Sequence, residues 1–206
     1  MVTGAAATAR ERAWAVAAEV PDPELPMLTL ADLGVLAEVE VEAAGAVSAG
    51  AVSAETAEVP GAPAEAAVTA WLTPTYSGCP AVAEMAADVD RRLRAAGYAD
   101  VRVRLRLDPA WSTDLITAEG RRKLAEAGIA PPRSASERAA SAAAVGASPR
   151  GTASPLLTLG PTRHLVPCPL CGGTDTEELS RFGSTACKAL WRCRDCREPF
   201  ERVKEI

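Results

Sequence analysis

The stretch Thr73-Pro74-Thr75-Tyr76-Ser77-Gly78-Cys79-Pro80 joins an apolar run, residues 66–72, to an amphipathic run, residues 81–96. The first run predicts a strand, and the second predicts a helix because its apolar residues recur at helical spacing. Pro80 favours a helix start, since proline at the first helical position loses no needed hydrogen bond. Cys79 would then be the N-cap, where open amides and the helix dipole stabilise a thiolate. A small buried cysteine filling a tight turn explains the same pattern equally well.

Two more strands and two more helices are predicted around this turn. Residues 5–20 are rich in alanine and favour a helix, which the prolines of residues 21–26 must end. Residues 35–42 alternate strictly between two faces, as in a half-buried strand, and residues 101–107 do the same. Thr117 can cap a short helix that Gly128 closes.

The charged faces of these strands predict their order. One strand carries Glu38, Glu40 and Glu42, and the other carries three arginines at 102, 104 and 106. Opposite charges facing each other on neighbouring strands stabilise a sheet by about 0.2–1 kcal/mol per pair. We therefore expect the strand at 35–42 to lie in the middle, which is the order 2-1-3. The predicted fold class is α/β (α+β), a small three-stranded sheet packed by helices, followed by a zinc ribbon.

Two stretches of low complexity divide the chain. Residues 43–65 and 133–155 consist mostly of Ala, Ser, Gly, Glu and Pro without a clear period. The first predicts a flexible insertion, and the second predicts a disordered linker. The domains are thus expected at residues 1–132 and 156–206.

Composition excludes several classes of function. The chain has 206 residues and a net charge of −5, whereas general nucleic-acid binding needs a basic face. No apolar run approaches the ~20 residues of a membrane span. The first residues lack a basic segment followed by an apolar core, so we expect no signal peptide and no membrane association.

The tail contains two Cys-x-x-Cys pairs, Cys168/Cys171 and Cys193/Cys196. Each pair can offer two sulfurs to one Zn²⁺ in tetrahedral geometry. About 50 residues build only a small core, so a structural metal would supply folding energy. The spacing, in a chain without an export signal, favours zinc over two disulfides or a redox dithiol.

The remaining candidate ligands are few. Cys187 is a fifth sulfur in the tail, either a strand residue of the ribbon or an extra functional thiol. His164 is the single histidine, and the four cysteines already complete a ligand set. One histidine cannot build a histidine-based triad or a multi-histidine iron site.

Several motifs together resemble a known family. Asp-Pro-Glu-Leu-Pro at 22–26, Asp-Leu-Gly at 32–34 and the turn at 75–80 resemble the SufT-type metal–sulfur cluster assembly domain. The chain is more closely similar to one branch, PaaD, the D subunits of the bacterial phenylacetyl-CoA epoxidase system. The motifs shared with that branch lie at residues 74–80, 109–114, 120–132, 182–190, 193–196 and 198–200.

The resemblance implies an accessory role in a cytoplasmic pathway that activates phenylacetyl-CoA. A di-iron oxygenase and an iron–sulfur flavin reductase would be the partners, and the chain would help to assemble their iron or Fe–S centre. Cys79 would bind iron or a cluster transiently. The carboxylates of Asp22, Glu24 and Asp32 would orient partners or add oxygen ligands, and Thr75 and Tyr76 would shape the pocket. The alternative for the three acids is that they are solvated side chains that cap turns, and Trp111 is expected in the core.

Three other functions fit parts of the sequence. The chain could be a structural subunit of the epoxidase without a cluster, or a thiol redox protein that uses its Cys-x-x-Cys pairs. Arg192, Arg194 and Arg197 are compatible with a nucleic-acid-binding ribbon, which the acidic first domain opposes. The sequence does not specify an oligomeric state.

Overall fold

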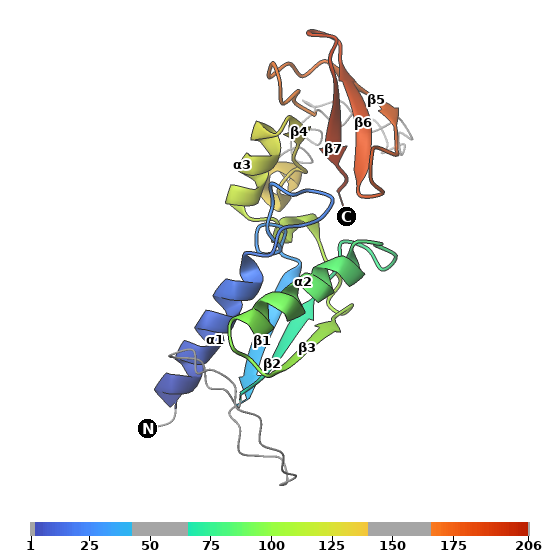
Figure 1. Ribbon diagram of the computed structural model, residues 1–206. Coiled ribbons are helices and arrows are strands. Elements are labelled where there is room, and N and C mark those ends of the chain that lie inside the picture. Colours follow the sequence, from blue (N-terminus) through green and yellow to red (C-terminus); the bar gives the residue numbers. More distant parts are fainter. Residues whose placement is uncertain (1–2, 43–65, 140–165, 206) are drawn as a thin grey trace, which may run out of the picture. The chain divides into compact units, whose positions relative to one another are not determined.

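The computed structural model in Figure 1 describes residues 3–42, 66–139 and 166–205. The chain divides into two compact units, residues 1–120 and 121–206, and each is described by itself. The predicted insertion at 43–65, residues 140–155 of the predicted linker and His164 lie outside the described residues. The elements in chain order are α1 (Thr3–Ala18), β1 (Leu36–Glu42), β2 (Ala67–Leu72), α2 (Val82–Ala95), β3 (Asp100–Leu105), the 3-10 helix η1 (Thr113–Leu115), α3 (Ala118–Glu126), β4 (Ile129–Ala130), β5 (Thr176–Ser180), β6 (Lys188–Cys193) and β7 (Pro199–Val203).

Unit 1 contains a three-stranded sheet with two long helices packed on it. β1 pairs antiparallel with β2, and β2 pairs in parallel with β3. α1 contacts β1, α2 contacts β3, and the two helices contact each other (Figure 1). Val68 and Leu72 of β2 are buried, as are Val89 and Leu93 of α2. The expected α/β (α+β) class with a small three-stranded sheet is therefore confirmed.

The predicted strand order 2-1-3 is wrong, because β2 lies in the centre of the sheet. Helix α2 forms the crossover that parallel pairing of β2 and β3 requires. Glu38 and Arg104 are therefore not neighbours, and Trp71 of β2 lies between them in the register.

Trp71 of β2 interacts with charged side chains on both sides of it. Its Nε1 donates to the Glu40 carboxylate at 3.1 Å. The guanidinium groups of Arg104 and Arg106 lie 5.8 and 5.0 Å from its ring centroid, within the range of cation–π attraction. Arg106 also pairs with Glu38 at 2.7 Å. Opposite charges do meet on one face, as the sequence suggests, but β2 with Trp71 lies between the two charged strands.

β1 departs from the strict alternation predicted for residues 35–42. A register shift lies between Leu36 and Glu38, so that Leu36 and Val39 are both buried and Ala37 is exposed. Such a bulge adds one residue to a strand and changes which side chains face the core. It lets both Val35 and Leu36 enter the core at the start of the strand.

On each outer strand of this sheet, one backbone carbonyl accepts a hydrogen bond from an arginine side chain of a helix. Arg10 of α1 donates from Nε to the Val39 oxygen at 3.0 Å. Arg94 of α2 donates to the Val101 oxygen at 3.3 Å. These groups lie on strand edges that would otherwise present open backbone acceptors.

Unit 2 is built around a four-stranded sheet in the order β4-β7-β6-β5. β5, β6 and β7 are antiparallel neighbours, which confirms the predicted ribbon. β4 joins β7 in parallel through Ile129 and Ala130. Among the described residues of this unit, one cluster of buried side chains contains Ala130, Val166, Cys168, Ala189, Trp191, Cys193 and Phe200.

The boundary between the units differs from the predicted one. The sequence suggests a first domain that ends at residue 132, whereas the units meet between Gly120 and Arg121. The Pro-Pro pair at 131–132 indicated a domain end, but proline is also tolerated at the end of a short edge strand. Ile129 and Ala130 are buried in unit 2.

Candidate functional site

Two knuckles of the same design carry the four clustered cysteines. The N–H of Cys168 donates to the Gly173 oxygen, and the N–H of Cys193 donates to the Glu198 oxygen, at 2.8 and 3.1 Å. In each knuckle the residue after the second cysteine has a positive φ, 76° at Gly172 and 66° at Arg197. Glycine adopts this conformation freely, and arginine adopts it at a cost of about 1 kcal/mol or more. The backbone is therefore shaped to direct both sulfurs of each pair inward.

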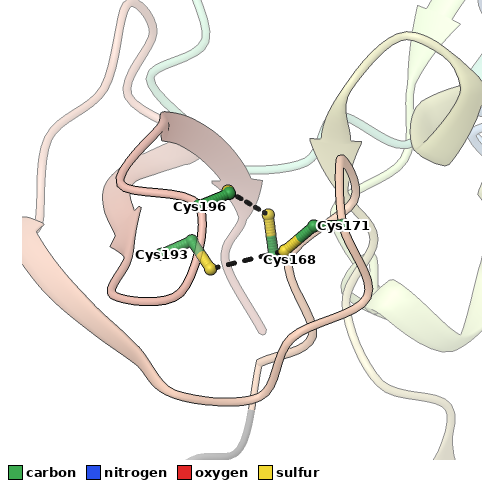
Figure 2. A group of neighbouring side chains, drawn as sticks. All are labelled: Cys168, Cys171, Cys193 and Cys196. Carbon is green, nitrogen blue, oxygen red and sulfur yellow. Dashed lines mark hydrogen bonds between the residues drawn. The ribbon is translucent and has the colours of Figure 1, made fainter.

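The four sulfurs converge on one point, as Figure 2 shows. Cys168 Sγ lies 3.8 Å from Cys196 Sγ, and Cys171 Sγ lies 3.6 Å from Cys193 Sγ. All four sulfurs lie within 4.8 Å of one another. A tetrahedral zinc site with Zn–S bonds of about 2.3 Å separates its sulfurs by about 3.8 Å. The geometry and the donor set both fit Zn²⁺, and the six cysteines, all within the described ranges, form no disulfide.

The electrostatics of this group also fit a cation. The N–H of Cys196 lowers the pKa of Cys193, whose thiolate it stabilises. At Cys196 the N–H of Glu198 acts in the same direction, but burial and the other three sulfurs outweigh it and raise the pKa to about 12. Four thiolates this close repel one another, and a divalent cation offsets that repulsion.

Cys79 lies in a loop at one end of the sheet of unit 1. Leu72, the last residue of β2, pairs with Leu36 and with Leu105, so three loops meet at this end. Thr73 is tied there by a 2.8 Å bond from its N–H to the Val35 oxygen. The topology therefore brings the turn around Asp32 to the same end as the 73–80 loop.

The predicted N-cap position of Cys79 is wrong. The N-cap of α2 is Ala81, whose φ of −71° and ψ of −15° are already helical, and Cys79 lies two residues earlier. Pro80 and Ala81 form a turn before the helix, and the Cys79 carbonyl accepts from the Val82 N–H at 3.4 Å. The Cys79 side chain is half-buried. Its sulfur is therefore further from the helix dipole than the sequence suggests.

Tyr76 and Thr75 lie in the Cys79 loop, where Tyr76 is half-buried. The Tyr76 carbonyl accepts from the Cys79 N–H at 3.2 Å. A Cβ at Gly78 would lie 3.0 Å from Cε2 of the Tyr76 ring, so the ring packs closely against this glycine. Tyr76 thus helps to fix the backbone that leads to Cys79.

Asp22 and Asp32 are buried, and their carboxylates bind backbone amides. Asp22 Oδ1 accepts from the N–H of Glu24 and Leu25 at 2.8 and 2.7 Å. Asp32 Oδ2 accepts from the Thr29 N–H at 3.0 Å, and Thr29 Oγ1 accepts from the Asp32 N–H. These contacts are those of turn caps.

Among the described residues, one group has three or more side chains placed to share a metal ion, and it is the set of four tail cysteines. Cys79 does not join Asp22, Glu24 or Asp32 in such a group. Cys187 lies just before β6 with its sulfur 3.1 Å from Thr185 Oγ1, outside the four-cysteine set.

The third loop at the end of the sheet holds two residues in the core. Trp111 is buried, as expected, and donates from Nε1 to the Leu33 oxygen at 2.9 Å. Thr113 is fully buried, which sequence reasoning missed because threonine in a polar turn gives no apolar signal. Thr117 caps α3 as predicted, with its Oγ1 2.9 Å from the Gly120 N–H.

Gly120, the last residue of unit 1, lies against the backbone of the Asp32 turn. A Cβ at position 120 would lie 2.7 Å from the Asp32 carbonyl oxygen. That contact is shorter than van der Waals packing allows. Only glycine therefore fits at this point of unit 1.

No helix within the described ranges combines the length and the apolar composition needed to cross a membrane.

Comparisons with known proteins agree with the motifs. The model of the PaaD zinc beta ribbon domain matches residues 152–204. The chain is 36% identical over 199 residues to the D subunit of the "Putative 1,2-phenylacetyl-CoA epoxidase" of Escherichia coli (strain K12), covering 94% of this chain and 91% of that protein. The solved structure of the domain of unknown function DUF59 from Bacillus anthracis is 18% identical with a TM-score of 0.46, covering 59% of this chain and 96% of that one. The full-length similarity and the matching ribbon together show that the chain belongs to the PaaD family.

Proposed function

We propose that the chain is an accessory subunit of the phenylacetyl-CoA epoxidase system in the cytoplasm. It would help to assemble or insert an iron or iron–sulfur centre in the oxygenase or reductase component. The observation that carries the proposal is the 36% identity to the Escherichia coli relative over 94% of the chain. That similarity spans both units and is not confined to the ribbon.

The four tail cysteines have a structural task in this proposal. Cys168, Cys171, Cys193 and Cys196 would hold one Zn²⁺, which stabilises the fold of unit 2. Four protein ligands complete a tetrahedral site and leave no position for a substrate. The ribbon is therefore proposed as the part that recognises a client, and not as a reaction centre.

The half-buried Cys79 is proposed as the transient ligand for iron or a cluster. Its loop is held by the backbone bonds of Tyr76 and Thr73, and the buried turn of Asp32 lies at the same end of the sheet. The iron or cluster is cargo in this scheme, so a single thiolate that binds and releases it suffices. Asp22 and Asp32, whose carboxylates accept hydrogen bonds from backbone N–H groups, would stabilise the turns.

The proposal is tested in cells that need the epoxidase for growth on phenylacetate. We expect Cys79→Ser to reduce epoxidase activity, together with the iron content of the purified oxygenase and reductase components. Ser77→Ala is the matched control, because it changes an exposed side chain of the same loop and leaves the Cys79 thiol in place. Full metal loading of both components with the Cys79→Ser protein, correctly folded, would reject the role of Cys79.

A non-catalytic structural subunit is the second candidate. It is favoured by the engagement of Asp22 and Asp32 with backbone amides, and by the position of Cys79 outside the described group of side chains that could share a metal ion. In that case the Cys79→Ser protein would co-purify with the active oxygenase in fixed stoichiometry. The metal content of the oxygenase and reductase components would not change. A redox function of the Cys-x-x-Cys pairs requires free thiols, so tight stoichiometric zinc in the purified protein would contradict it.

A further inference from the structure

The loop that joins β5 to β6, residues 181–187, carries the most exposed large apolar side chain among those described. Phe182 retains 73% of its surface in contact with solvent. We call this segment the Phe182 loop. We propose that it is a docking element for a protein component of the epoxidase system, one that offers an apolar pocket for the phenyl ring and acidic side chains around the pocket. The choice of partner rests on the proposed function.

The carboxylate of Glu201 in β7 binds the Phe182 loop. Glu201 of β7 accepts from the Ser184 N–H at 2.6 Å through Oε1 and from Lys188 Nζ at 2.7 Å through Oε2. Lys188 is buried, with 5% of its side chain exposed. Burial opposes ionisation of Glu201, but the bonds from Lys188 and Ser184 lower its pKa overall. This ion pair, with Lys188 buried and Glu201 half-buried, links the loop to β7.

Further backbone bonds fix the ends of the loop. The Gly183 N–H donates to the Lys188 oxygen at 2.9 Å, and Lys204 donates from its backbone N–H to the Cys187 oxygen at 2.9 Å. A Cβ at Gly183 would lie 2.8 Å from the Glu201 carboxylate, so a larger residue there would have to displace that carboxylate. The loop therefore has little conformational entropy to lose when it binds.

A rigid loop that displays an aromatic side chain has the properties of a binding anchor. Interface hot spots are enriched in large side chains that fill a pocket, and preorganised segments bind at lower entropic cost. Without a partner, exposure of the phenyl ring forgoes the gain from burial, about 1.5–3 kcal/mol for a side chain of this kind. The bonds among Ser184, Lys188 and Glu201 hold the loop on which the phenyl ring is exposed.

The charges beside the ring identify the chemistry of the partner. Lys204 Nζ lies 4.8 Å from the centroid of the Phe182 ring, and Arg181 is exposed next to it. Glu201, the acidic group beneath the loop, is neutralised by Lys188. An acidic rim on the partner would complement these two cations. A second copy of the same loop would instead bring like charges together.

The test measures binding of the full chain, loaded with zinc, to the purified oxygenase and reductase components. We expect wild type to bind one component and Phe182→Ala to weaken the dissociation constant about tenfold or more, as for a central anchor. Lys204→Ala should weaken binding less and reduce its dependence on salt. Leu107→Ala is the matched control, because this leucine is 60% exposed in unit 1. Zinc content and circular dichroism of each variant confirm that it is folded.

The outcomes separate the docking proposal from the proposed function. If wild type binds and Phe182→Ala binds equally well, the docking proposal is overturned and the accessory role stands. If wild type binds neither component, the proposed function and this choice of partner both fail. Self-association of wild type, or binding to phosphatidylglycerol vesicles, that Phe182→Ala abolishes would also overturn the commitment to an acidic protein partner.

Discussion

Glu205 is the residue that ties two distant arginines of unit 2 together. Its carboxylate accepts from Nε and Nη2 of Arg133 at 2.9 and 3.1 Å, and it also accepts from Arg202. Burial alone would raise the pKa of Glu205, but the bonds from Arg133 and the charge of Arg202 lower it to about 2. The ionised carboxylate is therefore part of the folded state.

We predict that Glu205→Gln destabilises unit 2 at pH 7 by about 1–3 kcal/mol, the range for a charged hydrogen-bonding group. The folded pKa lies below the ordinary value of 4.5, so the contribution is present above pH 4.5 and is lost as the pH falls towards 2. Denaturant unfolding of the zinc-loaded protein at several pH values measures it. Glu198→Gln, an exposed glutamate of the same unit, is the control. A difference from wild type that grows as the solution is acidified would contradict the assignment.

β4 is the element that the sequence assigned to the other domain. It is only two residues long, yet both are buried and both pair with β7 in the ribbon sheet. Its neighbours in the core include Cys168 and Cys193, two of the four proposed metal ligands. The order of β4 should therefore depend on the metal.

Hydrogen exchange tests this dependence. We predict that β4 and β7 amides are protected in the zinc-loaded protein and lose protection when zinc is chelated, because the metal supplies folding energy to this small core. Amides of β2, which is the central strand of unit 1, should remain protected and serve as the internal control. Unchanged exchange at β4 after verified removal of zinc would show that β4 does not depend on the ribbon.

Helices, strands and metal ligands were predictable where a short sequence motif or an apolar period determines them. The two Cys-x-x-Cys pairs indicated the ligand set, and the apolar stripes indicated α2 and the three strands of unit 1. The order of those strands was not predictable from the charged stripes, because Trp71 of the central strand interacts with charged residues on both sides and neither stripe reveals it. The bond pattern of Asp22 and the support of Phe182 by Glu201 also depend on how the chain folds back, so local sequence does not contain them.

At the scale of the whole molecule, the chain consists of two units with different sources of stability. Unit 1 has helices packed on a sheet, with buried leucines and valines throughout. In the described part of unit 2, the cluster of buried residues in the ribbon has seven members, two of which are cysteines of the metal group. A core of that size gives little stability without a metal.

We therefore predict two thermal transitions in calorimetry of the zinc-loaded chain. Chelation should remove or lower the transition of unit 2 and leave that of unit 1 unchanged. Cys168→Ser should act as chelation does, because it removes one of four ligands, whereas Cys187→Ser should not. A single transition that shifts as a whole on chelation would mean that the two units unfold together.

The arginines on the outer strands of unit 1 have a consequence for the protein in a crowded cell. Any foreign strand seeking to extend the sheet beside Val39 or Val101 must first displace a guanidinium from the carbonyl it needs. Through these two arginines the helices compete for one carbonyl on each outer strand, which disfavours the addition of a further strand at those positions.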